Sequence, residues 1–242
     1  MGRHGTIAGR KAAQDSRRAA LFTKYARAIT VAAKDGGDPE YNATLRLAIE
    51  KAKGISMPND NITRAIKKGT GELAGETYEE LTFEGYGVGG VAVIVEALTD
   101  NNNRTTSSVR STFDKYGGNL GTQGCVSYMF SRKGVLVLEK TDAIDEDALM
   151  EVALEAGADD MTSDEESFEI TTEPEAFADV HKALTDAGYE FISAEVERVP
   201  SVEAAPKPED IGKLRKMIEL LEDNDDVQNV FTNCSIDLYE ED

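Results

Sequence analysis

The sequence predicts an α+β protein, in which an N-terminal three-helix bundle precedes two ferredoxin-like α/β sandwich domains, one inserted in the other. Three observations predict this class. Apolar side chains recur at helical spacing within residues 1–75, whereas β-branched runs alternate with helical segments after residue 80. Residues 135–200 then contain a complete β-α-β-β-α-β series, which is the element order of a ferredoxin-like fold.

The first 75 residues are expected to form three short helices. The first spans Ala12–Lys34, where four apolar side chains recur at helical spacing until a DGGDP turn ends it. The second spans Ala43–Lys53 and ends at Gly54. Turn-forming and N-capping side chains at residues 58–61 precede the third helix, Ile62–Lys68. Three such helices can form a small bundle.

A β-α-β unit is expected next. Val91–Leu98 is a β-branched run that suits a buried strand, and Asp100–Asn103 can cap a helix over Arg104–Tyr116. We interpret Val126–Phe130 as the second strand of this unit. The sequence Ser-Arg-Lys-Gly at residues 131–134 is then expected to turn the chain toward the next domain.

The segment 135–200 is expected to close a core of its own. Its predicted elements are a strand at Val135–Leu138, a helix at Glu146–Ala156, strands near Met161 and at Phe168–Thr172, a helix at Pro174–Ala187 and a strand at Tyr189–Val199. The first of these strands could pair with either sandwich. Residues 200–210 carry three of the six prolines and are interpreted as a linker.

The remaining tail is too short for a domain. It offers one helix, Ile211–Glu222, and one strand, Val227–Ser235, so we expect it to return to the β-α-β unit and complete that sandwich. The sequence therefore predicts a basic helical domain at residues 1–80, a discontinuous α/β sandwich at 81–134 plus 201–242, and an acidic inserted ferredoxin-like domain at 135–200.

Charge is distributed unevenly along the chain. The whole sequence has 26 Lys and Arg against 46 Asp and Glu, a net charge of −20, which would repel nucleic acid if it were spread evenly. Residues 1–75 hold 14 basic and 7 acidic side chains, a net charge of +7, which leaves −27 for the rest. The inserted segment accounts for −17 of that. Such asymmetry suggests different partners for different parts of the chain.

The sequence offers little for catalysis, metal binding or membrane insertion. His4 and His181 neighbour no nucleophile motif, so we expect no enzyme, no catalytic residue and no small-molecule substrate. Cys125 and Cys234 lie far apart and in no CxxC motif, so neither a metal nor a cofactor is expected. The acidic run Glu222–Asp226 is interpreted as solvated surface. No apolar run reaches about 18 residues and no secretory signal is visible, which indicates a cytoplasmic protein without membrane contact.

Two loops are candidates for ligand contact. The glycines of GYGVGG at Gly85–Gly90 precede a strand, whereas phosphate-binding loops follow one, so a permissive turn is favoured there over nucleotide binding. At Thr99–Thr106 a strand does lead into a helix, where an arginine and free amides can meet an anion. A capped turn with a solvated arginine is the other interpretation. The possible contact residues are Gly85, Gly87, Gly89, Gly90, Asp100, Asn101 and Arg104.

The basic side chains near the N-terminus are the most informative candidates. They form a leading arm, a one-sided stripe on the first helix and a cluster on the third, and each set can neutralise phosphates. The candidate nucleic-acid-binding residues are Arg3, Arg10, Lys11, Arg17, Arg18, Lys24, Arg27, Arg64, Lys67 and Lys68. Docking of this face on the acidic domain of the same chain is the competing interpretation.

Long segments of the sequence resemble the YebC/PmpR family. They are RKAAQDSRRAALFTKYARAITVAAKDGGDPEYNATLRLAIEKAKGISMPNDNITRAIKKGTGE, YEELTFEGYGVGGVAVIVEALTDNNNRT and GGNLGTQGCVSYMFSRKG. The resemblance implies a helical N-terminal domain followed by two α/β domains, the last inserted in the middle one. The family's usual opening resembles GHSKWANIKHRK, whereas this chain has GRHGTIAGRK, so stacking by that Trp is not expected here.

The resemblance also implies a function. It points to a cytoplasmic, non-catalytic, DNA-binding transcriptional regulator, with duplex DNA as its partner. Relatives tied to translation imply the alternative, a ribosome-associated factor that contacts ribosomal or transfer RNA and relieves stalling at proline-rich stretches. Both functions need contact with nucleic acid, and neither needs a catalytic residue.

Overall fold

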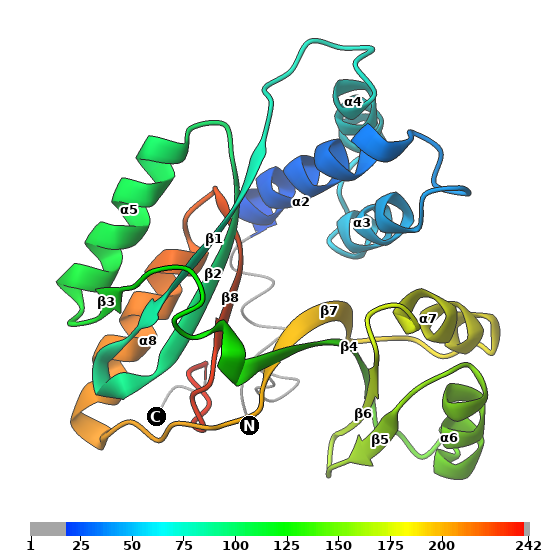
Figure 1. Cartoon of the computed structure of the whole chain (residues 1–242). Coiled ribbons are helices and arrows are strands. Elements are labelled where there is room, and N and C mark those ends of the chain that lie inside the picture. Colours follow the sequence, from blue (N-terminus) through cyan, green and yellow to red (C-terminus); the bar gives the residue numbers. More distant parts are fainter. Residues whose placement is uncertain (1–17, 240–242) are drawn as a thin grey trace.

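The computed structural model describes residues 18–239 and confirms the α+β class. Within these residues, seven α-helices accompany two four-stranded antiparallel sheets. We refer to residues 18–70 as the head, to the sheet built from residues 79–120 and 227–232 as sheet A, and to the sheet built from residues 130–200 as sheet B. In Figure 1 the head lies above sheet B, and both lie beside sheet A.

The head is a three-helix bundle, as the sequence predicts. Its helices are α2 (Arg18–Ala32, followed by a 3₁₀ turn at Ala33–Asp35), α3 (Ala43–Gly54) and α4 (Asn59–Gly69). Asn42 caps α3, because its side chain accepts the Leu45 N–H at 3.0 Å. Helices α2 and α4 approach closely, since a Cβ at Gly69 would lie 2.3 Å from the Thr30 carbonyl oxygen. The bundle therefore has a fixed shape that determines where its charged side chains point.

Sheet A combines the middle of the chain with the tail. Its strands are β1 (Glu79–Tyr86), β2 (Ala92–Thr99), β3 (Asn119–Leu120) and β8 (Val227–Thr232), in the order β3-β1-β2-β8, and all neighbours are antiparallel. Helices α5 (Asn102–Lys115) and α8 (Pro208–Glu222) cover one face and bury side chains such as Val93, Phe113 and Leu214 against it. The tail thus pairs with β2, as expected.

Strand β1 has no counterpart among the predicted strands. Its glutamates and glycine are weak strand formers when taken alone, so the local sequence gave little signal. The glycine is required by packing, because a Cβ at Gly85 would lie 2.5 Å from the Asn119 carbonyl oxygen of the neighbouring β3. Tertiary contact, rather than local propensity, makes this segment a strand.

The predicted strand Val126–Phe130 is wrong. Ser127–Met129 form a 3₁₀ turn, and Phe130 instead begins the first strand of sheet B. The N–H groups of Val126 and Ser127 donate to the buried carboxylate of Glu84 on β1, at 3.0 and 2.8 Å. These donors are therefore not available for a strand ladder.

Sheet B has the predicted β-α-β-β-α-β order. Its elements are β4 (Phe130–Glu139), α6 (Glu146–Glu155), β5 (Asp160–Ser163), β6 (Ser167–Thr172), α7 (Phe177–Asp186) and β7 (Ser193–Pro200), and its strand order is β5-β6-β4-β7. This is the order of a ferredoxin-like sheet, with both helices packed over a core that includes Leu136, Phe168 and Leu184.

The predicted turn at residues 131–134 is wrong. Strand β4 runs through these residues without a break and pairs with β7 from Phe130 opposite Pro200 to Val137 opposite Ser193. Gly134 resembles a turn signal in the sequence, but it is a packing position under Phe177 of α7. The assignment of residues 1–80, 81–134 plus 201–242, and 135–200 to three domains stays a prediction.

Replacing Gly134 by alanine should destabilise sheet B. The added Cβ would lie 2.3 Å from Thr172 Oγ1 and 2.6 Å from Phe177 Cδ2, so we expect a loss of about 1–3 kcal/mol in the free energy of unfolding. Urea unfolding followed by circular dichroism measures this. Gly54→Ala is the matched control, because nothing lies within 4 Å of a Cβ there and alanine favours the end of α3. Equal stability of the two variants would contradict this packing argument.

Candidate nucleic-acid interface

The structure divides the predicted phosphate-binding residues into groups that face different surroundings. Arg3, Arg10, Lys11 and Arg17 lie outside the described residues, and Arg18 begins α2. Lys24 and Arg27 of α2 face sheet A, whereas Arg64, Lys67 and Lys68 belong to α4. Their role in binding nucleic acid stays a prediction, but their accessibility differs sharply.

The cations of α4 face solvent. Arg64 and Lys67 are exposed, and neither makes an ion pair or a hydrogen bond from its side chain within residues 18–239. Lys68 is half-buried, and its Nζ lies 3.6 Å from Glu76 Oε2. Lys67 and Lys68 also occupy the last turn of α4, where the helix dipole favours positive charge. This face keeps at least two cations available to an external anion.

The cations of α2 are held by the turn between α8 and β8, residues 222–226. Lys24 donates to the Glu222 carbonyl oxygen at 2.5 Å. Arg27 Nη1 donates to the Asp225 carbonyl oxygen at 2.7 Å and to Asp226 Oδ1 at 2.5 Å. Lys24 and Arg27, two residues of the stripe that the sequence marks as a phosphate-binding face, are thus engaged within the chain and hold the head on sheet A.

Asp226 receives donors from α5 as well as from the head. Arg104 Nη2 approaches Asp226 Oδ1 and Oδ2 at 3.0 and 2.9 Å, and the Thr105 hydroxyl donates to Oδ2 at 2.7 Å. The Asp226 side chain is only 5% exposed. Burial alone would raise the pKa of Asp226, but the hydrogen bonds from Thr105, Arg104 and Arg27 outweigh it and hold the pKa below its ordinary value of 3.8. The carboxylate is therefore charged at neutral pH.

Interpreting the whole acidic run at 222–226 as solvated surface is therefore wrong for Asp226. The neighbouring Asp225 is exposed and fits that interpretation. Sequence reasoning missed Asp226 because its partners Arg27 and Arg104 lie about 200 and 120 positions away along the chain. The local signal for Asp226 is only its place in an acidic run, whereas the competing interpretation of the basic stripe places its acidic partner in the inserted domain.

The two candidate contact loops lie at opposite ends of β2. Asp100, Asn101 and Arg104 follow its last residue and adjoin the head, where Asn101 caps α5 by accepting the Arg104 N–H at 3.1 Å. The glycines precede its first residue and pack under α8, since a Cβ at Gly87 would lie 2.8 Å from Leu214 Cδ1. The structure therefore does not bring the two loops into one site.

The head also touches sheet B, through α3. Lys51 Nζ lies 3.4 Å from Glu195 Oε2, and His181 Nε2 lies 3.8 Å from Glu50 Oε2. Leu47 packs against the apolar cluster of sheet B. The His181 ring stacks on a phenylalanine ring, with 4.8 Å between the ring centroids. Burial lowers the pKa of His181, so its imidazole is neutral at pH 7. Docking on the acidic domain thus occurs, but through α3 rather than through the basic stripe of α2.

A second buried carboxylate shapes the loop after β3. Glu84 is 3% exposed and accepts the N–H groups of Gly124, Val126 and Ser127. Burial would raise the pKa of Glu84, but these three hydrogen bonds lower it below its ordinary value. No motif in the sequence marks Glu84 as a functional residue. Its role is to hold the loop in one shape over the second face of sheet A.

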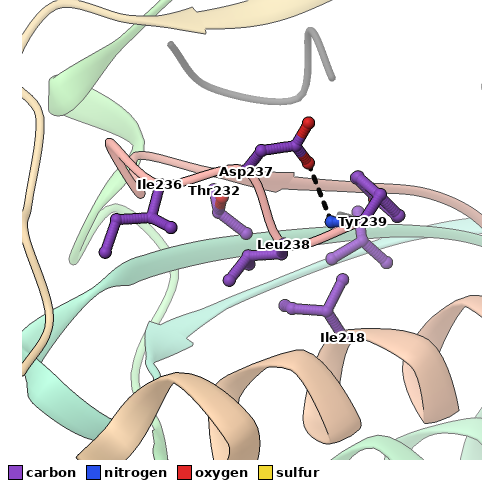
Figure 2. A pocket seen from close by; sticks show the side chains of 7 residues that line it. Ile218, Thr232, Ile236, Asp237, Leu238 and Tyr239 are labelled. Carbon is purple, nitrogen blue, oxygen red and sulfur yellow. Dashed lines mark hydrogen bonds between the residues drawn. The ribbon is translucent and has the colours of Figure 1, made fainter. Parts of the chain in front are cut away.

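Two hollows in the described part of the chain differ in size and in shape. Figure 2 shows the tail turning back over Ile218 and Thr232, with the Tyr239 N–H donating to Asp237 at 2.8 Å. This hollow holds only about 10 Å³, the space of one water molecule. An open groove of about 470 Å³ between α5 and α8 is lined by polar residues such as Ser111 and Lys115. Within residues 18–239 no group of His, Cys, Asp or Glu could hold a metal ion, and no helix is long and apolar enough to cross a membrane.

The fold and the site define a three-part α+β protein in which a basic helical head is mounted by ion pairs on an α/β sandwich. Family models agree with this class. The model for the TACO1/YebC protein N-terminal domain matches residues 3–72, and the model for the TACO1/YebC second and third domain matches residues 78–234. The chain belongs to the TACO1/YebC family, which confirms the resemblance to YebC seen in its sequence.

Individual relatives match along nearly the whole chain. A protein of Clostridioides difficile (strain 630) is 55% identical over 98% of this chain and 100% of its own length, and one of Clostridium novyi (strain NT) is 56% identical over 94% and 93%. Both are named "Probable transcriptional regulatory protein". The crystal structure of a conserved hypothetical protein from Aquifex aeolicus has a TM-score of 0.83 and 46% identity, over 94% of this chain and 93% of that one.

Asp226→Asn should lower stability in a pH-dependent way. The asparagine amide has one acceptor oxygen instead of two and no negative charge, so it binds the donors of residue 226 less strongly. We therefore expect a loss of about 2 kcal/mol in the free energy of unfolding at pH 7. Because the folded-state pKa of Asp226 lies below 3.8, the carboxylate stabilises the fold above that pH, and the benefit is lost as pH falls through the folded-state pKa.

Urea unfolding of wild type and variant at pH 7 and near pH 3 measures this. The difference between them should narrow at the lower pH. Asp225→Asn is the control and should have no effect at either pH, since its side chain is exposed. A difference that stays constant between the two pH values would contradict the assigned ionisation of Asp226.

Proposed function

We propose that this chain is a non-catalytic, cytoplasmic regulator of transcription that binds duplex DNA through its head. The observation that carries the proposal is a pair of exposed cations on α4, Arg64 and Lys67, whose side chains make no ion pair or hydrogen bond within residues 18–239, in a chain whose net charge is −20. Cations without an internal partner are the groups that can neutralise phosphates. The names of the relatives support the same class of function.

The acidic parts of the chain limit how DNA can approach. Sheet B and its helices carry most of the negative charge, so a duplex is repelled from that side and attracted only by the head. Before DNA binds, the contact of Arg27 with Asp226 holds the head on sheet A and thereby sets the direction of the exposed face of the head. We infer that binding is weak away from the head and depends on its orientation.

Reversing the charge of α4 should weaken DNA binding. For Arg64→Glu with Lys67→Glu we expect at least a tenfold loss of affinity, and a salt dependence of log K that falls by about 0.9 for each phosphate contact removed. Fluorescence anisotropy with a labelled duplex at several salt concentrations measures both. Lys213→Glu with Lys216→Glu is the matched control, with the same spacing and charge change on exposed positions of α8. An unchanged salt slope in the α4 variant would remove the head from the interface.

The nucleic acid that the chain binds in cells distinguishes a transcriptional regulator from a ribosome-associated factor. Crosslinking of the native chain in cells, followed by sequencing of the bound nucleic acid, should recover promoter DNA if the proposal is correct. Purified protein should then prefer such promoters over random duplex by about 10³ or more. Reads dominated by ribosomal or transfer RNA would overturn the assignment to transcription, although nucleic-acid binding by the head would remain.

A further inference from the structure

We propose that the inward face of α2, which carries Lys24 and Arg27, is a second phosphate-binding surface that the 222–226 turn covers until duplex DNA displaces it. The head would then open on binding and use both of its basic faces. The inference rests on the proposed function, because both need nucleic acid, but it adds a masked interface and a movement of the head.

The covered contact has the chemistry of a phosphate site. Arg104 approaches Asp226 through two nitrogens, as arginine binds both carboxylate and phosphate oxygens. Arg27 and the Thr105 hydroxyl complete the set of donors. Arginine side chains and hydroxyl groups are the usual contacts of proteins with the phosphodiester backbone. Asp226 therefore occupies the position that an external anion would take against Arg27.

Opening the head leaves Asp226 with its other partners. Arg104 and Thr105 lie on α5, which packs on sheet A together with the turn that carries Asp226, so these contacts do not depend on the head. Asp226 loses only Arg27, and the Glu222 carbonyl oxygen loses Lys24. A buried carboxylate that lost all its donors would prevent opening, but this one keeps two of its three partner residues.

Arg27 is incompletely satisfied in the docked arrangement. Its Nε is buried and has no hydrogen-bond partner within the described residues. Besides Asp226, its Nη1 donates to two carbonyl oxygens, those of Leu98 and Asp225. A phosphate group offers more oxygen acceptors to the same guanidinium. When a polyanion such as DNA is present, exchanging Asp226 for a phosphate group therefore improves the hydrogen bonding of the Arg27 guanidinium.

The connection between head and sheet A permits the movement. Residues 70–77 are all exposed and contain neither helix nor strand. The polar contacts of α3 with sheet B, Lys51 with Glu195 and Glu50 with His181, are partly exposed pairs and contribute little. The inward contact of α2 with the 222–226 turn is thus the main polar barrier to opening.

Crosslinking of the wild-type chain tests the proposal without any substitution. Formaldehyde joins accessible lysine amines to DNA bases, and peptide mapping identifies the lysines. In the docked head Lys24 is 9% exposed and its amine donates to Glu222, whereas Lys67 is exposed. With a 20-base-pair duplex we expect adducts at both Lys67 and Lys24. Adducts at Lys67 without Lys24 would overturn the inference and leave the proposed function standing, and adducts at neither would contradict both.

A pair of neighbouring substitutions tests the role of Asp226 itself. Asp226→Asn weakens the docked state, so duplex affinity should rise about fivefold to tenfold and the yield of the Lys24 adduct should increase. Asp225→Asn makes the same change in net charge at the exposed neighbouring position and should alter affinity less than twofold. Equal gains from both variants would mean that only net charge matters and would overturn the inference. If Asp226→Asn fails to fold, the wild-type adducts decide.

Discussion

The buried carboxylate of Asp226 is the interaction on which the arrangement of the three parts most depends. An isolated charge at 5% exposure would cost several kcal/mol, and the hydrogen bonds from Arg27, Arg104 and Thr105 offset this cost. Two of these partners lie on α5 and the third lies on the head. A single side chain thus fixes the start of α5, the turn before β8 and the angle at which the head leaves sheet A.

This contact gives the two basic faces of the head different properties. Lys24 and Arg27 donate to oxygens of the chain itself, whereas the exposed side chains of Arg64 and Lys67 have no partner among residues 18–239. The net charge of −20 therefore does not indicate the local charge of either basic face of the head. Acidic residues of the tail hold the bundle on sheet A, whereas the exposed side chains of Arg64 and Lys67 form a cationic surface on α4.

The sequence predicts those parts of the fold whose signals are local. Helical periodicity identified the three helices of the head, and the β-α-β-β-α-β order identified sheet B. The failures arise where distant contacts override local preference: Gly85 is a strand residue because β3 lies against it, and Gly134 is a strand residue because Phe177 packs over it. In the candidate nucleic-acid interface, too, local signals are readable from the sequence and distant contacts are not. Charge identified the head as a basic part of the chain, but the partner of Arg27 could not be read locally, because Asp226 lies 199 positions further along the chain.

The most direct test of this account is a titration of isotope-labelled chain with a 20-base-pair duplex, followed by amide chemical shifts. The account predicts the largest changes on α4, residues 59–69, and in the 222–226 turn that holds the head, with little change in residues 135–195 of sheet B. Changes concentrated in sheet B, or none on α4, would contradict the claim that the head is the nucleic-acid interface and that Asp226 mounts it.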